Sequence, residues 1–391
     1  MEVNPRRVEQ QLRNLQRVLD AYHPPEPFAR FLTKFFKENK QMGSSDRRMV
    51  SRLSYNLFRL GRSLENLPTL DRVVIAEFLC EKQSDMVTLH QPAWVAHIQL
   101  PLKEKMQFLA KQGHEITHGL FSFSSPLSAS IDAEQFALSH LIQPDLFIRV
   151  PRVNQQRVEK ELTAQQISFE TLSGNAYRLP NGTNLQAVNK LEGLYEVQDV
   201  SSQESLAGLN LVAGAKWWDA CAGAGGKSLL LLDRCPAIAL LVSDIRPSIL
   251  RNLDERFRKA KIKADVRTKV MDLTQDIDDI MEGKSFDGIL VDAPCTGSGT
   301  WGRTPEMLTQ FDEEHIQTFV SLQQRIVDSV VRYLKPDGVL MYITCSVFDA
   351  ENEQLVRYLV DKHGLTVEAA GIIKGYDRKS DSMFAARLRN A

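Results

Sequence analysis

The chain has 391 residues, of which 43% are hydrophobic and 25% are charged. Such a chain is long enough for two or three domains, and its composition is that of folded soluble proteins, which excludes a largely disordered chain. No stretch approaches the ~18 consecutive apolar residues of a membrane span, and the opening MEVNPRRVEQQLRNL lacks the apolar run of a secretory signal. We therefore expect a cytoplasmic protein that does not associate with membranes.

The net charge of −1 hides an uneven distribution. Residues 1–64 contain 13 Lys and Arg against 6 Asp and Glu, a surplus of 7 positive charges that fits either a solvated helical face or an anionic partner. The five cysteines are odd in number and form no CxxC pair, so we expect reduced thiols, no disulfide framework and no metal site. Nothing in the sequence requires more than a monomer.

The first 140 residues are expected to form a helical domain. Apolar residues recur at helical spacing from Pro5 to about Leu67, interrupted at 23–27 and 42–46, and further helices are expected at 71–82 and 101–112. Residues 141–205 then combine DLFIRV, an amphipathic segment at 155–166 and ISFETL, which predicts a small α+β subdomain.

Residues 206–391 are expected to form an α/β domain. Short apolar runs (KWWDA, AIALLVSD, ADVRTKV, FDGILVD, GVLMYITC) alternate with helical stretches, including a long helix at 313–334. This alternation predicts a mostly parallel sheet covered by helices on both faces. Functional residues are then expected at the carboxyl ends of the strands.

A glycine-rich turn follows the first of these strands. In DACAGAGGK (219–227), Gly223, Gly225 and Gly226 permit a tight turn and close approach of backbone amides to a ligand, although the spacing matches neither a phosphate-binding loop nor a dinucleotide fingerprint. Asp244 ends the next strand, where it can accept hydrogen bonds from a ribose, and Asp272 follows the third, where it can accept one from an adenine amino group. Either carboxylate alone could merely cap a helix, but together they favour an adenosine ligand.

Two thiols are expected at the carboxyl ends of neighbouring strands. Cys295 lies in DAPCTGSGTW after the fourth strand, and Cys345 lies in YITCS at the end of the fifth. Cys80 and Cys235 fit the role of small buried apolar residues, whereas the glycine-rich run after Cys295 should leave that thiol accessible.

Paired thiols beside a methyl donor indicate a particular reaction. Carbon 5 of cytosine becomes nucleophilic only after a thiolate adds to carbon 6, and a base must later remove the proton from carbon 5 so that the thiolate can leave. Free thiols ionise near ~8.5, so nearby positive charge or amide dipoles would have to favour the thiolates. The residues alone do not indicate which thiol attacks.

These motifs resemble the Sun/Fmu (NOL1/NOP2/Sun) family of RNA cytosine-5 methyltransferases, most closely its bacterial ribosomal RNA small subunit methyltransferase B type. The resemblance runs through RVNQQRVEKEL (152–162), VQDVSSQ (197–203), DACAGAGGKS, DAPCTGSGTWGRTPE, YITCS, AENE and SDSMFAARL. DAPC together with TCS is its most specific part.

The resemblance implies an S-adenosylmethionine-dependent enzyme that methylates RNA, with 16S ribosomal RNA the expected substrate. It implies that Cys345 is the nucleophile, that Cys295 is the base needed for product release, and that Asp292 positions the cytosine, with Lys227 also at the catalytic centre. The implied cofactor-binding residues are Ala220, Cys221, Ala222, Gly223, Ala224, Gly225, Gly226, Lys227, Asp244, Arg246, Asp272 and Asp292.

The resemblance also implies a Rossmann-like catalytic domain with a mostly parallel seven-stranded sheet, a small RNA-recognition-like subdomain at 141–205, and a NusB-like RNA-binding domain at 1–140. Two motifs depart from the family pattern: the usual CAAPGGKT turn reads CAGAGGKS, without its proline, and WGRTPE replaces an arginine-rich RRHPD-like segment. We expect the first to retain cofactor binding and the second to alter RNA contacts.

Other functions fit these motifs less well. An adenine- or guanine-modifying methyltransferase would carry an Asn-Pro-Pro-Tyr-like loop in place of DAPC, and a nicotinamide-dependent oxidoreductase would carry a glycine fingerprint that is absent here. A catalytically inactive RNA-binding or ribosome-assembly protein would not need both thiols and Asp292. A transfer RNA substrate remains an alternative to ribosomal RNA.

Overall fold

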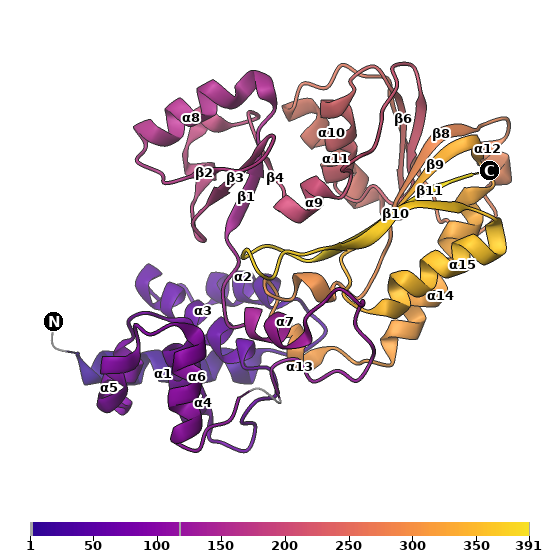
Figure 1. The fold of residues 1–391 in the computed structure, drawn as a ribbon. Helices are drawn as coiled ribbons and strands as arrows, with labels where there is room; N and C mark the ends of the chain where they lie inside the picture. The colour runs from indigo at the N-terminus through magenta and orange to yellow at the C-terminus, as the bar shows by residue number, and fades with distance from the viewer. Residues whose placement is uncertain (1–2, 117–118, 391) are drawn as a thin grey trace. The chain divides into compact units, whose positions relative to one another are not determined.

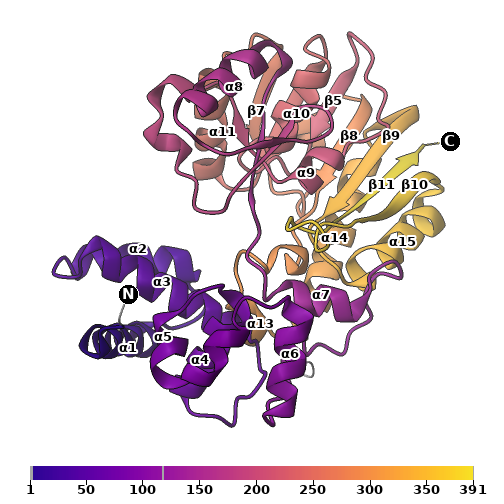
Figure 2. The same ribbon diagram turned by 60° about the vertical axis from the view of Figure 1, so that its left-hand side comes forward.

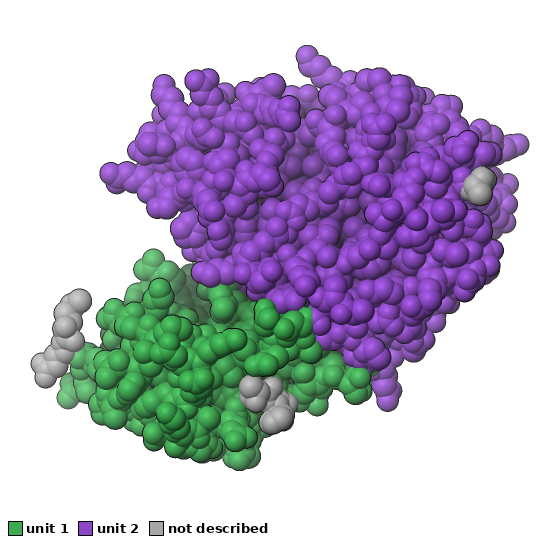
Figure 3. Space-filling model, viewed as in Figure 1, with its two compact units in different colours: residues 1–124, 132–143, 301–313 green, residues 125–131, 144–300, 314–391 purple. Residues whose placement is uncertain are grey.

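The computed structural model describes residues 3–116 and 119–390. The described chain divides into two compact units (Figure 3). We call residues 1–124, 132–143 and 301–313 the helical unit, and residues 125–131, 144–300 and 314–391 the sheet unit. Each unit therefore contains a segment that is separated in sequence from the rest of it.

The helical unit is built from amphipathic helices whose apolar faces pack together. Its cores contain Val18, Phe28 and Val50 in one cluster and Leu60, Phe78 and Leu109 in another. The helices are α1 (Pro5–Ala21), α2 (Phe28–Glu38), α3 (Ser44–Arg59), α4 (Thr69–Cys80), α5 (Asp85–His90), α6 (Leu102–Lys111), α7 (Ala133–Ser139) and α13 (Met307–Gln310).

Residues 301–313, which follow the DAPC motif directly, pack inside the helical unit. Trp301 is only 1% exposed, and its ring lies 5.2 Å from that of Phe123 and 5.0 Å from that of Phe311. The buried Arg59 donates to the backbone carbonyl of Gly302 at 2.9 Å. The sequence assigns this segment to the catalytic domain by its position along the chain, whereas its apolar and polar partners lie in the helical unit.

The sheet unit contains a small antiparallel sheet with strand order β2-β3-β1-β4 in the described residues. Val158 and Leu162 of the helix α8 (Gln155–Ala164) pack against Ile148 and Tyr177 of this sheet. Its strands are β1 (Leu146–Arg149), β2 (Glu170–Thr171), β3 (Ala176–Leu179) and β4 (Glu196–Val197). Of the expected strand ISFETL, only the two residues of β2 pair with a neighbour, β3.

The large sheet has seven strands in the described part of the chain, in the order β10-β11-β9-β8-β5-β6-β7 (Figures 1 and 2). The neighbouring pairs β7–β6, β6–β5, β5–β8 and β8–β9 are parallel. Strand β11 runs antiparallel to both of its neighbours, β9 and β10. The strands are β5 (Lys216–Asp219), β6 (Ala239–Asp244), β7 (Val266–Val270), β8 (Phe286–Asp292), β9 (Leu334–Thr344), β10 (Thr366–Ile373) and β11 (Met383–Arg389). The expected Rossmann-like α/β fold is confirmed.

Helices cover both faces of the large sheet, because each strand alternates side chains between two apolar cores. One core contains residues of α14 and α15, such as Val327 and Leu359, and the other contains residues of α10 and α11, such as Leu231 and Leu253. The helices of this part are α9 (Val200–Glu204), α10 (Gly226–Arg234), α11 (Pro247–Lys259), α12 (Asp278–Met281), α14 (His315–Val331) and α15 (Glu353–His363). Among the described residues, no helix is long and apolar enough to cross a membrane.

Candidate active site

The glycine-rich turn joins β5 to α10 in a conformation that requires glycine. Gly225 has a φ of +82°, and a Cβ atom at this position would lie 2.8 Å from the Leu253 side chain. The Gly225 N–H closes the turn by donating to the carbonyl of Ala222 at 2.9 Å. The turn is therefore pressed against α11, and larger residues at position 225 would push the two apart.

Asp244, at the end of β6, fixes the other side of the turn. Its carboxylate accepts from the Gly223 N–H at 3.0 Å and from the Arg246 N–H at 2.9 Å, and it pairs with the Arg246 guanidinium. Burial opposes the ionisation of Asp244, but these hydrogen bonds and the arginine hold its pKa below the ordinary value. Asp244 is thus an ionised acceptor at neutral pH.

A cavity of about 420 Å³ opens beside these residues, in the size range of small-molecule sites. It lies at the carboxyl ends of β5, β6 and β8 and contains both apolar and carboxylate side chains. Of the residues predicted to bind the cofactor, those that line the cavity are Ala220, Cys221, Asp244, Arg246, Asp272 and Asp292. Residues 222–227 do not line it.

Asp272, two residues past β7, makes a local turn as well as lining the cavity. One carboxylate oxygen accepts from both the N–H and the hydroxyl of Thr274, at 2.9 and 2.7 Å. These hydrogen bonds lower the pKa of Asp272. The Asp272 carboxylate also lines the cavity, where a donor group of a ligand can reach it.

The two expected thiols lie together. Strands β8 and β9 are parallel neighbours, and the Sγ atoms of Cys295 and Cys345 are 3.3 Å apart, within hydrogen-bond range for sulfur. Hydrogen bonding to Cys345, together with burial and the negative charge that Cys345 can carry, raises the pKa of Cys295 well above its ordinary value. Cys295 therefore keeps its proton at neutral pH.

Lys227 and Asp292 form an ion pair in the same region. Lys227 Nζ lies 2.7 Å from Asp292 Oδ2, and the lysine side chain is 9% exposed against 35% for the aspartate. Burial disfavours the ammonium, but Asp292 and the negative form of Cys345 outweigh it and raise the pKa of Lys227. A buried positive charge therefore acts on both the aspartate and Cys345.

Asp219, at the end of β5, directly precedes the turn and does not line the cavity. It is fully buried, and its Oδ2 accepts from the Ser228 hydroxyl at 2.5 Å. Burial raises the pKa of Asp219 to about 7, a shift that the Ser228 hydrogen bond partly opposes. The sequence shows this residue only as the start of the turn motif.

A buried carboxylate that sequence reasoning did not single out joins the two thiol loops. Glu351, of the AENE motif, is 0% exposed and accepts from Thr296, next to Cys295, and from Ser346, next to Cys345. It also accepts from Gln323 Nε2 at 2.9 Å. Only the family motif pointed to this segment, since no local pattern distinguishes Glu351 from a solvated helix residue.

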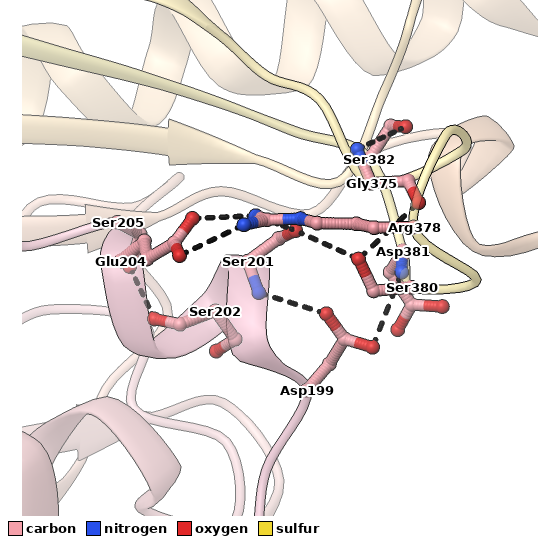
Figure 4. Close-up of polar contacts among 10 residues, drawn as sticks. All are labelled: Asp199, Ser201, Ser202, Glu204, Ser205, Gly375, Arg378, Ser380, Asp381 and Ser382. Atoms are coloured by element: carbon pink, nitrogen blue, oxygen red, sulfur yellow. Dashed lines mark hydrogen bonds and ion pairs between the residues drawn. The ribbon is translucent and has the colours of Figure 1, made fainter. Parts of the chain in front are cut away.

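A second loop, residues 375–382, contacts the loop that follows Cys295 through Gly299. Gly299 donates to the Cys345 carbonyl and accepts from the Ser382 N–H, both at 2.9 Å, and a Cβ at position 299 would lie 2.0 Å from the Ser382 carbonyl oxygen. Figure 4 shows Arg378 of this loop paired with Glu204 of α9. The VQDVSSQ and SDSMF motifs meet here as well, since the Asp381 N–H donates to Asp199 Oδ2 at 3.1 Å.

The chain was compared with known proteins. Residues 206–386 match the family described as 16S rRNA methyltransferase RsmB/F. A curated relative, ribosomal RNA small subunit methyltransferase B of Xylella fastidiosa (strain 9a5c), is 39% identical over 208 residues, which are 50% of this chain and 49% of the relative. The Yersinia enterocolitica protein of the same name is 31% identical over 228 residues, 56% of this chain and 52% of the relative. The chain thus spans about half the length of these relatives.

Solved structures share the fold over more of the chain. The crystal structure of PH0851 aligns with 95% of this chain and 96% of its own, with a TM-score of 0.69 and 19% identity. NSun6 from Pyrococcus horikoshii, solved with SFG, aligns with 66% of this chain and 94% of its own, with a TM-score of 0.60 and 16% identity. At these identities the solved structures show a shared fold and nothing further.

Proposed function

We propose that the chain transfers a methyl group from S-adenosylmethionine to carbon 5 of a cytosine in ribosomal RNA, because residues 206–386 match the family described as 16S rRNA methyltransferase RsmB/F. The observation that carries the proposal is the 3.3 Å approach of Cys295 and Cys345 at the ends of β8 and β9. Their proximity to the Lys227–Asp292 ion pair supports it further.

The cavity suits the proposed cofactor. Asp244 is ionised, and the Asp272 carboxylate is an acceptor one strand farther along the same edge, which matches a ribose followed by an adenine amino group. Met271, Leu273 and Ile326 supply apolar walls for the adenine ring. When bound, S-adenosylmethionine supplies an electrophilic methyl group for carbon 5.

Cys345 is the nucleophile in this proposal. Cys295 retains its proton and can donate a hydrogen bond to a Cys345 thiolate, and the Lys227 ammonium acts on the same sulfur. The thiolate adds to carbon 6 of the cytosine, and the electron pair of the 5,6 double bond moves toward carbon 5 and the N3 edge. The Asp292 carboxylate can accept from the N4 amino group and so hold this edge of the cytosine, and the Lys227 ammonium paired with it offsets the negative charge that develops toward N3.

Cys295 acts as the base once carbon 5 carries the methyl group. After addition, the Cys345 sulfur is a neutral thioether, so the hydrogen bond and negative charge that raised the Cys295 pKa are gone. Cys295 can then lose its proton to water and remove the proton from carbon 5. The double bond re-forms and the Cys345 thiolate is expelled.

The RNA must present an unstacked cytosine, because a thiol reaches carbon 6 only from the ring face. A single-stranded loop of structured ribosomal RNA fits this requirement. We further propose that the helical domain (1–140) and the small subdomain (141–205) bind the RNA.

The test uses purified protein, methyl-labelled S-adenosylmethionine, and 16S ribosomal RNA or transfer RNA in separate reactions. Wild-type protein should yield 5-methylcytosine in the ribosomal RNA. Cys345→Ala should give neither product nor covalent adduct, and Cys295→Ala should accumulate a protein–RNA adduct that survives denaturing gels.

Full activity in Cys345→Ala would rule out the mechanism. Methylation of transfer RNA alone would change the proposed substrate but leave the proposed chemistry unchanged. RNA binding without any methyl transfer in the wild-type protein would favour an assembly protein instead.

A further inference from the structure

The cofactor turn of this chain lacks the proline of the resembling family and carries Ala224 in its place. Proline fixes φ and restricts the turn before a ligand arrives, whereas alanine leaves more conformational freedom to be lost on binding. A turn that keeps its function without the proline needs another restraint.

Such a restraint contacts Ala224 directly. Arg256, on α11, donates from Nη1 to the Ala224 carbonyl oxygen at 2.7 Å. The same guanidinium donates from Nη2 and Nε to one carboxylate oxygen of Glu196, at 2.7 and 3.2 Å. One planar group therefore links the cofactor turn to strand β4 of the small sheet.

This link is partly shielded from solvent. The side chains of Arg256 and Glu196 are 28% and 16% exposed, unlike the fully solvated pairs that contribute little. The planar guanidinium of arginine directs several N–H donors at once. Because it loses less conformational entropy per hydrogen bond than a lysine does, it restrains its partners better.

The surrounding packing holds α11 against both partners. Leu253 and Phe257 touch the space that a Cβ at Gly225 would occupy. A Cβ added at Gly193 in the small subdomain would lie 2.8 Å from the Lys259 carbonyl oxygen. The backbone of α11 is therefore fixed relative to the turn and to the segment before β4, and Arg256 is well placed to join them.

We infer that Arg256 and Glu196 are positioning residues that hold the cofactor turn in its binding conformation and so replace the missing proline. The inference rests on the proposed use of S-adenosylmethionine. It makes the small subdomain part of the cofactor site, since Glu196 orients the arginine that restrains the turn.

The experiment measures the Kd of S-adenosylmethionine by calorimetry in the full-length chain. Arg256→Ala should weaken binding by about tenfold, the range expected for one hydrogen bond from a charged group. Arg256→Lys should be intermediate, and Glu196→Gln should weaken binding less than Arg256→Ala. Ala224→Pro alone should change the Kd by less than about twofold.

The decisive variant combines Arg256→Ala with Ala224→Pro, which should recover most of the lost affinity. Arg258→Ala, an exposed cation on the same helix, serves as the matched control and should bind like wild type. The thermal midpoint of each variant separates positioning from general destabilisation.

The outcomes separate this inference from the proposed function. Wild-type protein that binds no S-adenosylmethionine overturns both. Wild-type binding with unchanged affinity in Arg256→Ala overturns the restraint alone. Weakened binding that Ala224→Pro fails to restore also overturns it, because the loss would then reflect general damage to α11.

Discussion

The backbone N–H of Thr296 donates to Glu351 Oε1 at 2.9 Å, and the Thr296 hydroxyl donates to Glu351 Oε2 at 2.7 Å. Thr296 follows Cys295 directly, and the same carboxylate accepts from Ser346, which follows Cys345. One buried side chain therefore restrains the loops of both thiols.

Replacing Glu351 should reduce turnover more than cofactor affinity. Glu351→Ala leaves buried donors without an acceptor and lets the loops shift, which we expect to lower kcat by about 10- to 100-fold. Glu351→Gln keeps one acceptor oxygen and should lose less. Steady-state kinetics with a parallel Kd for S-adenosylmethionine checks this, with the exposed Glu282→Gln as control; a loss confined to cofactor affinity would contradict the assignment.

Release of product should depend on the ionisation of Cys295. The hydrogen bond to Cys345 and burial both raise the Cys295 pKa before the adduct forms. Burial continues to oppose ionisation of Cys295 after the adduct forms. The decay of a preformed covalent adduct should therefore accelerate as pH rises, then level off once Cys295 is ionised. Adduct formed at neutral pH and shifted to a series of pH values gives the rate constants. Decay that is equally fast in Cys295→Ala would remove Cys295 from this step.

Lys227 should promote the reactivity of Cys345. Removing the ammonium in Lys227→Gln takes away the buried positive charge that acts on this sulfur. We expect alkylation of Cys345 by iodoacetamide to slow by about tenfold near pH 7.5, because the reacting sulfur loses the stabilisation of a nearby buried cation, and about 1.4 kcal/mol changes a rate tenfold. Measurements in a Cys295→Ser background isolate the Cys345 signal. Unchanged alkylation would mean that other groups favour the thiolate.

The meeting of the two thiols could be predicted from the sequence, because parallel strands bring their carboxyl ends to one edge of the sheet. Asp244 and Asp272 were predicted on the same ground, and both line the cavity. The alternation of apolar runs and helical stretches was strong enough to indicate the fold and the order of its motifs.

Other features depend on contacts that no local pattern encodes. Glu351 is separated by 55 positions from Thr296 and by 28 from Gln323. Arg256 resembles any solvated cation on an amphipathic helix until Ala224 is placed beside it. Trp301 follows the catalytic motif in sequence but finds its aromatic partners in the helical unit.

Asp219 should make the stability of the protein depend on pH. Its pKa is about 7 in the folded protein against an ordinary 3.8, so the folded state holds this proton more tightly than the unfolded chain. The stability contributed by the protonated form is fully present below about pH 4 and is lost as pH rises toward and through 7. The loss is on the order of 4 kcal/mol, since the two pKa values differ by about 3 units and one pKa unit corresponds to about 1.4 kcal/mol.

Asp219→Asn should remove this component, because the amide cannot ionise. Urea unfolding between pH 5 and 8 should show a smaller fall in the free energy of unfolding for Asp219→Asn than for wild type. The exposed Asp279→Asn should follow the wild-type curve. Parallel curves for Asp219→Asn and wild type would show that Asp219 is ionised in the folded protein throughout this range.

The positive surplus of residues 1–64, of which 1 and 2 lie outside the described residues, should contribute to RNA binding. Arg6, Arg13 and Arg17 are exposed on α1, whereas Arg59 is buried and holds the backbone of Gly302. Changing the three exposed arginines to Gln should lower the slope of log Kd against log salt concentration by about 2 to 3, since each phosphate contact contributes about 0.7 to 0.9. Filter binding to ribosomal RNA over a salt series gives the slope.

The matched control changes Lys82, Lys103 and Lys111 to Gln, which removes the same charge from exposed positions of the helical unit beyond residue 64. If α1 contacts phosphates, the slope should fall for the arginine variant and remain near the wild-type value for the control. Equal reductions in both variants would indicate a diffuse electrostatic attraction, and no reduction in either would place the RNA contacts elsewhere. Because base contacts do not release counterions, affinity at high salt should converge for all three proteins.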